Sequence, residues 1–342
     1  MKAVRIHSHG GPEVLRIDEI AEPTPGPGEV LVRMRAASVN HLDLWVRRGM
    51  PGHPVPFPRI LGCDGAGEVA ALGAGVAGLA LGTRVLVAPG VSSGVSREAL
   101  AGREQLAPDY RLLGEDCDGV DAELVAVPQA NAIPIPASVS YRDAAAIPLV
   151  FCTAWGMLVE KAQLRAGEDV LVLGAGSGVG SAAVQLAKLL GARVFTTVGG
   201  AAKVAKAIAL GADLVIDHEA QDFAAEVKRA TGGRGVDLVV EHVGQATFAR
   251  SLKSLAKGGR IVTCGATTGP KIELNLLHLF IKHQAILGST MGPKSCLFQA
   301  LRWMEQGRFR AVVDRVLPID DIAEAHRVVE RREHFGKVVL EL

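Results

Sequence analysis

Residues 169–190 read DVLVLGAGSGVGSAAVQLAKLL, and this stretch decides the fold. Its first five residues form the apolar run typical of a buried strand. Residues 181–190 place apolar side chains at helical spacing before Gly191, which predicts a helix that ends there. Between them lie Gly174, Gly176, Gly178 and Gly180, so the chain can turn sharply and its backbone can approach a phosphate at the start of the helix.

The same alternation continues along the chain. Strands are expected at residues 193–198, 214–216, 236–240, 260–263 and 285–287, and a helix at 203–210 that stops at Gly211. Strands that alternate with helices predict a parallel, doubly wound sheet, which is the Rossmann architecture of dinucleotide-binding domains.

The glycine-rich turn departs from the strict GxGxxG pattern, because the third position falls on Val179 or Ser181. A plain tight turn between strand and helix is the alternative, although four alternating glycines exceed what such a turn needs. The second strand ends without an acidic residue to accept a hydrogen bond from a ribose 2′-hydroxyl, and Lys203 follows it. This favours NADP(H) over NAD(H), unless Lys203 is an ordinary solvated helix residue.

Composition excludes several classes of protein. Of the 342 residues 49% are hydrophobic and the formal net charge is +1, with no basic block for nucleic acid or a membrane surface. No signal peptide or membrane span is expected. The five cysteines are scattered and form no CxxC pair, which indicates reduced thiols in a cytoplasmic protein. The first 130 residues carry short β-branched runs between Gly and Pro, so a mostly β domain is expected there.

Motifs along the whole chain resemble those of the medium-chain dehydrogenase/reductase superfamily, in particular its zinc-free branch similar to quinone oxidoreductases. They are GEVLV (28–32), ASVNHLD (37–43), GCDGAGEV (62–69), AAAIP (144–148), TAW (153–155), GGRI (258–261), LGST (287–290) and FGKVV (335–339). The resemblance implies an α/β protein with a GroES-like, mostly β substrate domain and a doubly wound Rossmann domain, and an active site in the cleft between them. The expected boundaries are 1–150 with 292–342 for the substrate domain, and 151–291 for the Rossmann domain that binds NADP(H).

The resemblance also places the catalytic zinc ligands of other branches at Asn40, Cys63 and Leu149. Leucine cannot bind zinc and asparagine is a poor ligand, so no catalytic metal is expected. A site improvised from His41, Cys63, Asp64 and Cys152 is the alternative. The four ligands of a structural zinc correspond to Ser93, Ser96, Ala99 and Ala107, so this lobe is expected to lack its metal and to be more mobile than in zinc-bound relatives.

Hydride transfer to a carbonyl compound requires the oxygen to be stabilised or protonated as charge develops on it. By the resemblance, the candidates near the nicotinamide are Asn40, His41, Asp43, Cys63 and Asp64, with Asn40 in contact with cofactor or substrate and Asp43 anchoring it from behind. Alternatively, Asp43 and Asp64 only brace the backbone of their loops. His7, His9, His53 and the histidines near the carboxy end are expected at the surface.

The resemblance extends to the cofactor and to the assembly. Its implied cofactor contacts are Asn40, Thr153, Gly176, Ser177, Gly178, Val179, Gly199, Lys203, Val243, Gly244, Gly265, Ala266, Ser289, Thr290 and Lys337. The family associates through an edge strand of the Rossmann sheet, here near Ala285–Gly288, so a homodimer or homotetramer is expected.

These observations favour an NADPH-dependent reductase of quinones or α,β-unsaturated carbonyl compounds, because such acceptors take a hydride without a strong acid beside them. A zinc-free alcohol or aldehyde dehydrogenase is a second reading. A nucleotide-binding protein with little turnover is the third.

Overall fold

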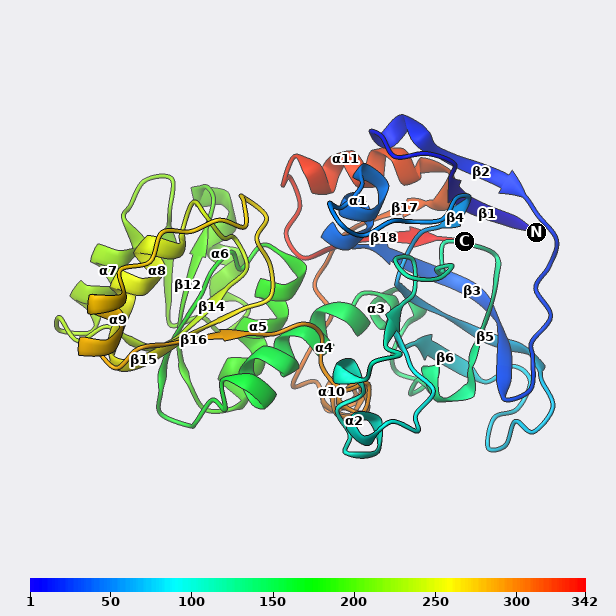
Figure 1. The fold of residues 1–342 in the computed structure, drawn as a ribbon, viewed down its shortest axis with the longest axis horizontal. Coiled ribbons are helices and arrows are strands. Elements are labelled where there is room, and N and C mark those ends of the chain that lie inside the picture. The colour runs from blue at the N-terminus through cyan, green and yellow to red at the C-terminus, as the bar shows by residue number, and fades with distance from the viewer. The chain divides into compact units, whose positions relative to one another are not determined.

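The computed structural model describes residues 1–342, and the chain divides into two compact units. Unit 1 comprises Met1–Leu149 and Pro293–Leu342, and unit 2 comprises Val150–Gly292. Both units can be followed in Figure 1 by the colour ramp, in which unit 1 takes the two ends of the scale. None of the helices is both long and apolar enough to cross a membrane.

Unit 2 contains one six-stranded sheet in the order β13-β12-β11-β14-β15-β16, and every neighbouring pair is parallel. Its strands are β11 (Asp169–Val172), β12 (Arg193–Val198), β13 (Leu214–Asp217), β14 (Val236–Glu241), β15 (Leu255–Thr263) and β16 (Ala285–Gly288). Numbered from β11, this is the strand order 3-2-1-4-5-6 of the Rossmann fold, so the predicted architecture is confirmed.

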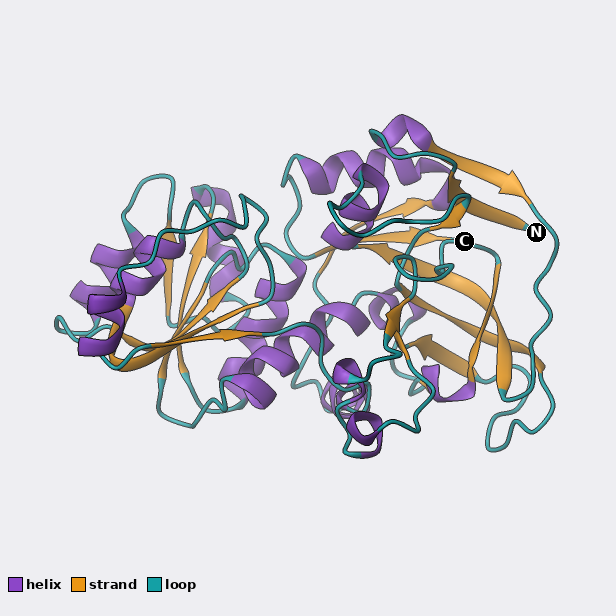
Figure 2. Ribbon diagram, in the orientation of Figure 1, coloured by secondary structure: helices purple, strands orange, loops and turns teal.

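Helices cover both faces of this sheet, α5 and α6 on one and α7 and α8 on the other (Figures 1 and 2). The helices of unit 2 and of the boundary are α4 (Pro148–Trp155), a π-helix (Gly156–Lys161), α5 (Gly178–Leu189), a 3-10 turn (Ala201–Lys203), α6 (Val204–Ile208), α7 (Phe223–Ala230), α8 (Phe248–Ser254) and α9 (Leu276–Ile281). Helix α5 begins at Gly178, three residues before the predicted start, because the hydroxyl of Ser177 accepts a hydrogen bond from the N–H of Gly180.

Unit 1 is built mainly from a seven-stranded sheet in the order β10-β6-β5-β3-β18-β17, with β9 also paired to β3. The strands are β3 (Glu29–Val39), β5 (Asp64–Leu72), β6 (Arg84–Val87), β9 (Leu124–Pro128), β10 (Ala132–Pro134), β17 (Val313–Pro318) and β18 (Lys337–Glu341). A second sheet joins β1 (Lys2–Ile6), β2 (Leu15–Glu19) and β4 (Arg59–Ile60), and a third pairs β7 (Gly90–Val91) with β8 (Arg111–Leu112). The predicted mostly β domain is therefore confirmed.

Five α-helices and four 3-10 turns complete unit 1. The helices are α1 (His41–Arg48), α2 (Arg97–Leu100), α3 (Tyr141–Ala145), α10 (Cys296–Glu305) and α11 (Ile322–Glu330). The turns are Pro12–Val14, Glu104–Leu106, Gln129–Asn131 and Ile319–Asp321. Helix α1 follows β3 directly and contacts α11.

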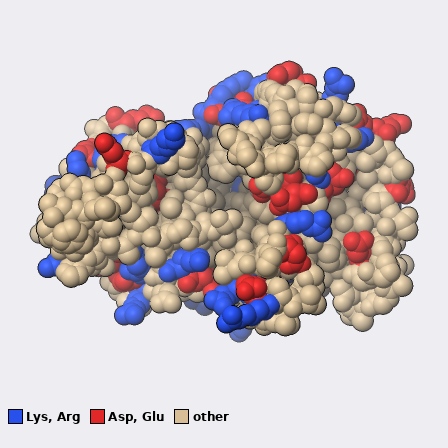
Figure 3. All heavy atoms as spheres, in the orientation of Figure 1, with Lys and Arg blue, Asp and Glu red and all other residues tan.

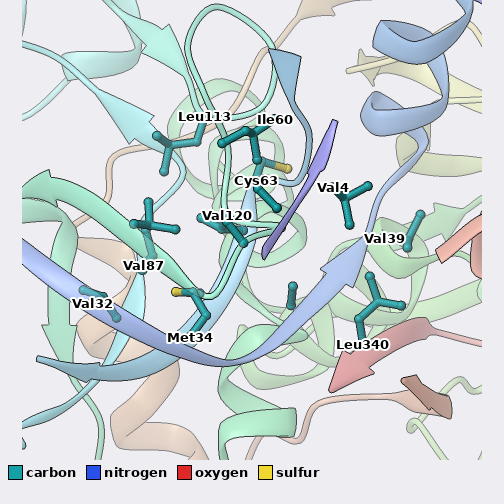
Figure 4. Packing of buried hydrophobic residues seen from close by; sticks show 14 of the residues in the cluster. Val4, Val32, Met34, Val39, Ile60, Cys63, Val87, Leu113, Val120 and Leu340 are labelled. Atoms are coloured by element: carbon teal, nitrogen blue, oxygen red, sulfur yellow. The ribbon is translucent and has the colours of Figure 1, made fainter. Parts of the chain in front are cut away.

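Each unit has its own apolar core. In unit 1 the buried cluster joins side chains of the two larger sheets, and Figure 4 shows Cys63 within it beside Ile60 and Val120. In unit 2 it includes Leu171, Phe195 and Ile261 on the sheet and Phe223 and Val227 on α7. Figure 3 shows lysines and arginines interspersed with acidic residues on the face in view, which agrees with a net charge of +1.

Candidate functional site

The junction of β3 and α1 holds the first candidate, Asn40, which is 5% exposed and is the N-cap residue of the helix. Its amide nitrogen donates to Asp64 Oδ2 at 2.8 Å and to Cys63 Sγ at 3.3 Å. Its amide oxygen accepts from the Lys337 ammonium at 2.5 Å. Because acceptors contact the amide nitrogen and a donor contacts the amide oxygen, the orientation of the Asn40 amide is determined.

Lys337 is the only cation of this buried cluster. The first residue of β18, it is brought to Asn40 because Val338 pairs with Val39 at the end of β3. It is 3% exposed and forms an ion pair with Asp64 at 3.0 Å. The other oxygen of Asp64 accepts the backbone N–H of Leu149 at 2.7 Å. Removing one partner of such a buried pair typically costs about 3–5 kcal/mol, so the pair holds β5 and β18 in place.

Asp43 and Cys63 are two further residues predicted in unit 1. Asp43 Oδ2 accepts the backbone N–H of Asn40 at 2.6 Å. Burial raises the pKa of Asp43 to about 7, against the opposing effects of that hydrogen bond and of Lys337. Burial also raises the pKa of the Cys63 thiol well above its ordinary value, with Asp43 and Asp64 adding to the effect. Cys63 is therefore a neutral thiol.

Asp121 is a member of the cluster that sequence reasoning missed. It is 2% exposed, and no hydrogen bond reaches its Oδ1. A Cβ atom on Gly62, which has φ +86°, would lie 2.2 Å from that oxygen, so only glycine fits opposite it. Burial raises the pKa of Asp121 well above its ordinary value. Nothing in the sequence around Asp121 distinguishes it from an exposed aspartate in a turn.

The three positions matched to catalytic zinc ligands lie together. Asn40 contacts Cys63, and Leu149 donates its N–H to the neighbouring Asp64. Their side chains are an amide, a neutral thiol and an aliphatic group. Asp64, a member of the alternative ligand set, already accepts from Lys337, Asn40 and Leu149. No group of three or more His, Cys, Asp or Glu side chains in the structure could hold a metal ion.

The lobe matched to a structural zinc contains hydrogen bonds at two of the four matched positions. Ser96 is the N-cap of α2, and its hydroxyl accepts from the N–H of Ala99 at 3.1 Å. The N–H of Ser93 donates to Asp109 at 2.7 Å. Ser96 therefore serves as a helix cap, and Ser93 anchors the loop through its backbone.

In unit 2 the glycine-rich turn has the features of a phosphate site. Gly174 has φ +62°, and a Cβ on Gly180 would lie 2.1 Å from the carbonyl oxygen of Gly174, so α5 approaches β11 more closely than a side chain would allow. The first N–H groups of a helix have no acceptor inside it, and Ser177 caps that of Gly180. Those of Gly178 and Val179 remain for an anion.

The turns after β14, β15 and β16 lie at the same edge of the sheet. Glu241 accepts from the N–H groups of Val243 at 2.7 Å and Gly244 at 3.1 Å, which fixes the turn after β14. A Cβ on Gly244 would lie 3.0 Å from Ala266, so the turns after β14 and β15 are neighbours. After β16, the hydroxyl of Ser289 is buried and has no partner in the chain. This orphan hydroxyl fits a site completed by a polar ligand.

The remaining predicted cofactor residues are distributed as follows. Thr153 is buried in α4 with its hydroxyl 3.7 Å from Met291 Sδ, and Gly265 lies against His242. Thr290 is exposed. Gly199 follows β12, and Lys203 closes the short 3-10 turn after it. Glu219 is a residue of this region that sequence reasoning missed. Its carboxylate lies over Gly199 and Gly200.

Taken together, unit 2 offers a dinucleotide the features it needs at the carboxyl edge of its sheet: a helix N-terminus, close glycine packing and an orphan hydroxyl. Unit 1 offers a buried cluster of Asn40, Cys63, Asp64 and Lys337, with one positive charge and no strong metal-ligand set.

Family models match two parts of the chain: an alcohol dehydrogenase GroES-like domain at residues 26–137, and a zinc-binding dehydrogenase domain at residues 178–306. Among curated relatives, pig (Sus scrofa) quinone oxidoreductase is 31% identical, with 99% of this chain and 97% of the relative covered. Acryloyl-coenzyme A reductase of Metallosphaera sedula is 32% identical, with 99% of both chains covered.

Among solved structures, one described as an NAD-dependent alcohol dehydrogenase is 48% identical and superposes with a TM-score of 0.97 over 100% of both chains.

Proposed function

Since the chain belongs to the medium-chain dehydrogenase/reductase superfamily and is an NAD(P)H-dependent oxidoreductase, we propose that it reduces quinones or α,β-unsaturated carbonyl compounds with NADPH and without a catalytic zinc ion. The relatives named quinone oxidoreductase and acryloyl-coenzyme A reductase support the substrate class. The observation that carries the proposal is the buried cluster of Asn40, Cys63, Asp64 and Lys337, in which Asn40 and Cys63 are two of the three residues matched by resemblance to catalytic zinc ligands.

When bound, the reduced nicotinamide supplies the hydride, and the protein must stabilise the oxygen that gains charge. Both hydrogens of the Asn40 amide are committed to Asp64 and Cys63. Lys337 uses two of its three N–H groups, on Asn40 and Asp64. The positive charge of the cluster is that of Lys337, and its third N–H is the donor proposed to stabilise the oxygen that gains charge. A quinone or an enone accepts hydride readily, so a single hydrogen-bond donor beside its oxygen is sufficient and a stronger acid is not required.

NADPH is favoured because β12 ends without an acidic residue and Lys203 follows. The proposal includes a cytoplasmic location, which is supported by five cysteines that are all free thiols. It also includes a homodimer or homotetramer, supported by the unpaired edge of β16.

A second candidate, oxidation of an alcohol with NAD, is favoured by one observation: the structure 48% identical to this chain is described as an NAD-dependent alcohol dehydrogenase. It predicts turnover with alcohols and a carbonyl product.

The deciding experiment follows oxidation of NADPH and of NADH at 340 nm against benzoquinones, enones and aldehydes, and reduction of NADP⁺ and NAD⁺ by alcohols. Metal content is measured by mass spectrometry on the same sample. We expect NADPH oxidation with quinones or enones that survives treatment with a chelator. Turnover confined to alcohols, or one zinc per chain with loss of activity on chelation, would overturn the proposal.

A further inference from the structure

The ends of β12 and β13 are joined by several hydrogen bonds. The two strands run parallel with Val198 opposite Asp217, so Gly199 and Gly200 follow one strand where His218 and Glu219 follow the other. The N–H of His218 donates to the carbonyl of Val198 at 3.0 Å. Asp217 Oδ1 accepts from the N–H groups of Gly200 at 3.0 Å and of Glu219 at 3.2 Å. The two loops are therefore held together as one surface.

On this surface the carboxylate of Glu219 lies above the glycine pair. A Cβ atom placed on Gly199 would be 3.1 Å from Glu219 Oε1, and one on Gly200 would be 3.6 Å from Oε2. The side chain of His218 lies over the same glycine, its Cε1 3.2 Å from the Gly199 position. Glu219 is exposed, so its carboxylate is available to a ligand.

The end of the second strand of a Rossmann sheet is where the adenosine ribose of the dinucleotide lies. A carboxylate there accepts a hydrogen bond from the 2′-hydroxyl of NAD(H) and repels the 2′-phosphate of NADP(H). The second strand of this chain lacks such an acid, but Glu219 brings one to the same place from the third strand. Lys203, three residues beyond Gly200, is the opposing charge.

We propose that Glu219 is a cofactor-selecting residue: it binds the 2′-hydroxyl of NAD(H), opposes Lys203 and weakens the binding of NADP(H). The inference rests on the proposed function only in that a nicotinamide dinucleotide occupies the turn at Gly174–Gly180. The wild-type chain then binds both dinucleotides, and the difference between them is set by two residues of opposite charge rather than by Lys203 alone.

The test measures the binding of NAD⁺ and NADP⁺ by isothermal titration calorimetry to the wild type, Glu219→Gln and Lys203→Ala, without any turnover. Removal of a like charge beside a phosphate should tighten NADP⁺ binding of Glu219→Gln about tenfold, and NAD⁺ binding should weaken. Because exposed charges are screened by salt, the gain for NADP⁺ should shrink in 0.5 M salt. Lys203→Ala should show the opposite change in NADP⁺ affinity.

Glu305→Gln is the matched control, since it removes one exposed carboxylate from α10 in unit 1. An unchanged ratio of NADP⁺ to NAD⁺ affinity in Glu219→Gln, or an equal change in Glu305→Gln, would overturn the inference. A wild type that prefers NADH while Glu219→Gln shifts toward NADP⁺ would instead overturn the NADPH part of the proposed function and leave the role of Glu219 standing.

Discussion

Asp43, Asp64 and Asp121 share a buried region that contains a single ammonium group, that of Lys337. Lys337 pairs with Asp64, and the carboxyls of Asp43 and Asp121 are left with raised pKa values because burial disfavours their charged forms. Asp43, with a pKa of about 7, therefore holds a proton below neutral pH in the folded protein, and this has a measurable effect on stability.

The first prediction concerns Asp43→Asn. An acid whose pKa rises from 3.8 to about 7 on folding binds a proton in the native state between these values, so the free energy of unfolding falls as pH rises through this window. Asparagine does not titrate, and its side-chain oxygen can still accept the N–H of Asn40. Urea unfolding should show the variant gaining roughly 1 kcal/mol or more over the wild type between pH 5 and pH 8.

The control for this measurement is Asp320→Asn, which changes an exposed aspartate of the same unit. A gap between Asp43→Asn and the wild type that stays constant across the pH range would show that Asp43 is ionised throughout.

At the scale of single residues, the sequence predicted those site residues that lie within recognisable motifs. Asn40, Cys63 and Asp64 belong to segments that resemble a known family, and the structure brings all three into contact. Asp121 and Glu219 could not be found this way. Asp121 lies beside Gly62 through contacts between loops, and Glu219 lies beside Gly199 through the pairing of β12 with β13. The expectation that histidines near the carboxy end are exposed is wrong for His326 and His334, which are 0% and 7% exposed.

Helices α1 and α11 are joined by a buried polar contact, which explains why His326 is not exposed. Arg47, the largest fully buried side chain of the molecule, donates to His326 Nδ1 at 2.9 Å and to the carboxylate of Glu330. Because an arginine can only donate, His326 must accept and is neutral. Burial, followed by the charges of Arg47 and Arg48, lowers the pKa of His326 to about 3.

The second prediction follows for His326→Gln. The unfolded chain takes up a proton below pH 6.5 that the folded state refuses down to about pH 3, so the wild type loses up to ~1.4 kcal/mol of unfolding free energy per pH unit in that range. Glutamine can still accept from Arg47 but does not titrate. Thermal unfolding between pH 7 and pH 4.5 should therefore show a shallower decline for the variant. An exposed-histidine control, His278→Gln, should follow the wild type.

The glycine-rich turn supplies the third prediction, for Gly180→Ala. Its new methyl group would lie 2.1 Å from the backbone oxygen of Gly174, so α5 must move away from β11. Overpacking of this kind costs about 1–3 kcal/mol, and the displaced helix N-terminus should bind dinucleotide at least tenfold more weakly, as measured by calorimetry. Gly288→Ala, whose added carbon meets nothing within 4 Å, is the control. Equal affinities for the two variants would refute the role of the turn.

At the scale of the whole molecule, unit 2 leaves an apolar surface beside an open sheet edge. β16 has no neighbour on one side. On the adjoining α9, Leu276 and Phe280 are each 65% exposed. In Figure 3 the end of unit 2 that carries α9 shows few charged side chains. Exposed apolar patches next to unpaired strands mark association surfaces.

The fourth prediction tests this surface with Phe280→Asp. If copies of the chain associate through α9 and β16, the buried charge should convert the assembly to a smaller species in light scattering after gel filtration. Leu100→Asp is the matched control, because Leu100 is 77% exposed on α2 of unit 1. Dissociation by the control and not by Phe280→Asp would place the interface elsewhere.

The sequence pattern predicts the architecture of unit 2 better than that of unit 1. The alternation of strands and helices in residues 169–288 determines a doubly wound sheet, because parallel strands need crossovers of one hand. The seven-stranded sheet of unit 1 shows no comparable pattern. Its neighbouring strands β3 and β18 are almost the whole chain apart in sequence, and only the family resemblance indicated that the two ends of the chain belong to one domain.

Because β18 lies between β3 and β17 but is translated last, the sheet of unit 1 can be completed only at the end of synthesis. About 190 residues separate the first segment of unit 1 from Lys337, which takes a ribosome roughly 10–40 s to translate. Unit 2 is complete before that, while β3 still lacks one of its neighbours and Asp64 has no counterion. The nascent chain thus carries a complete unit 2 while unit 1 still lacks β18, and the buried cluster around Asp64 forms only when Lys337 has been added. A pause or truncation upstream of β18 would leave β3 and β17 without the strand that pairs with both of them.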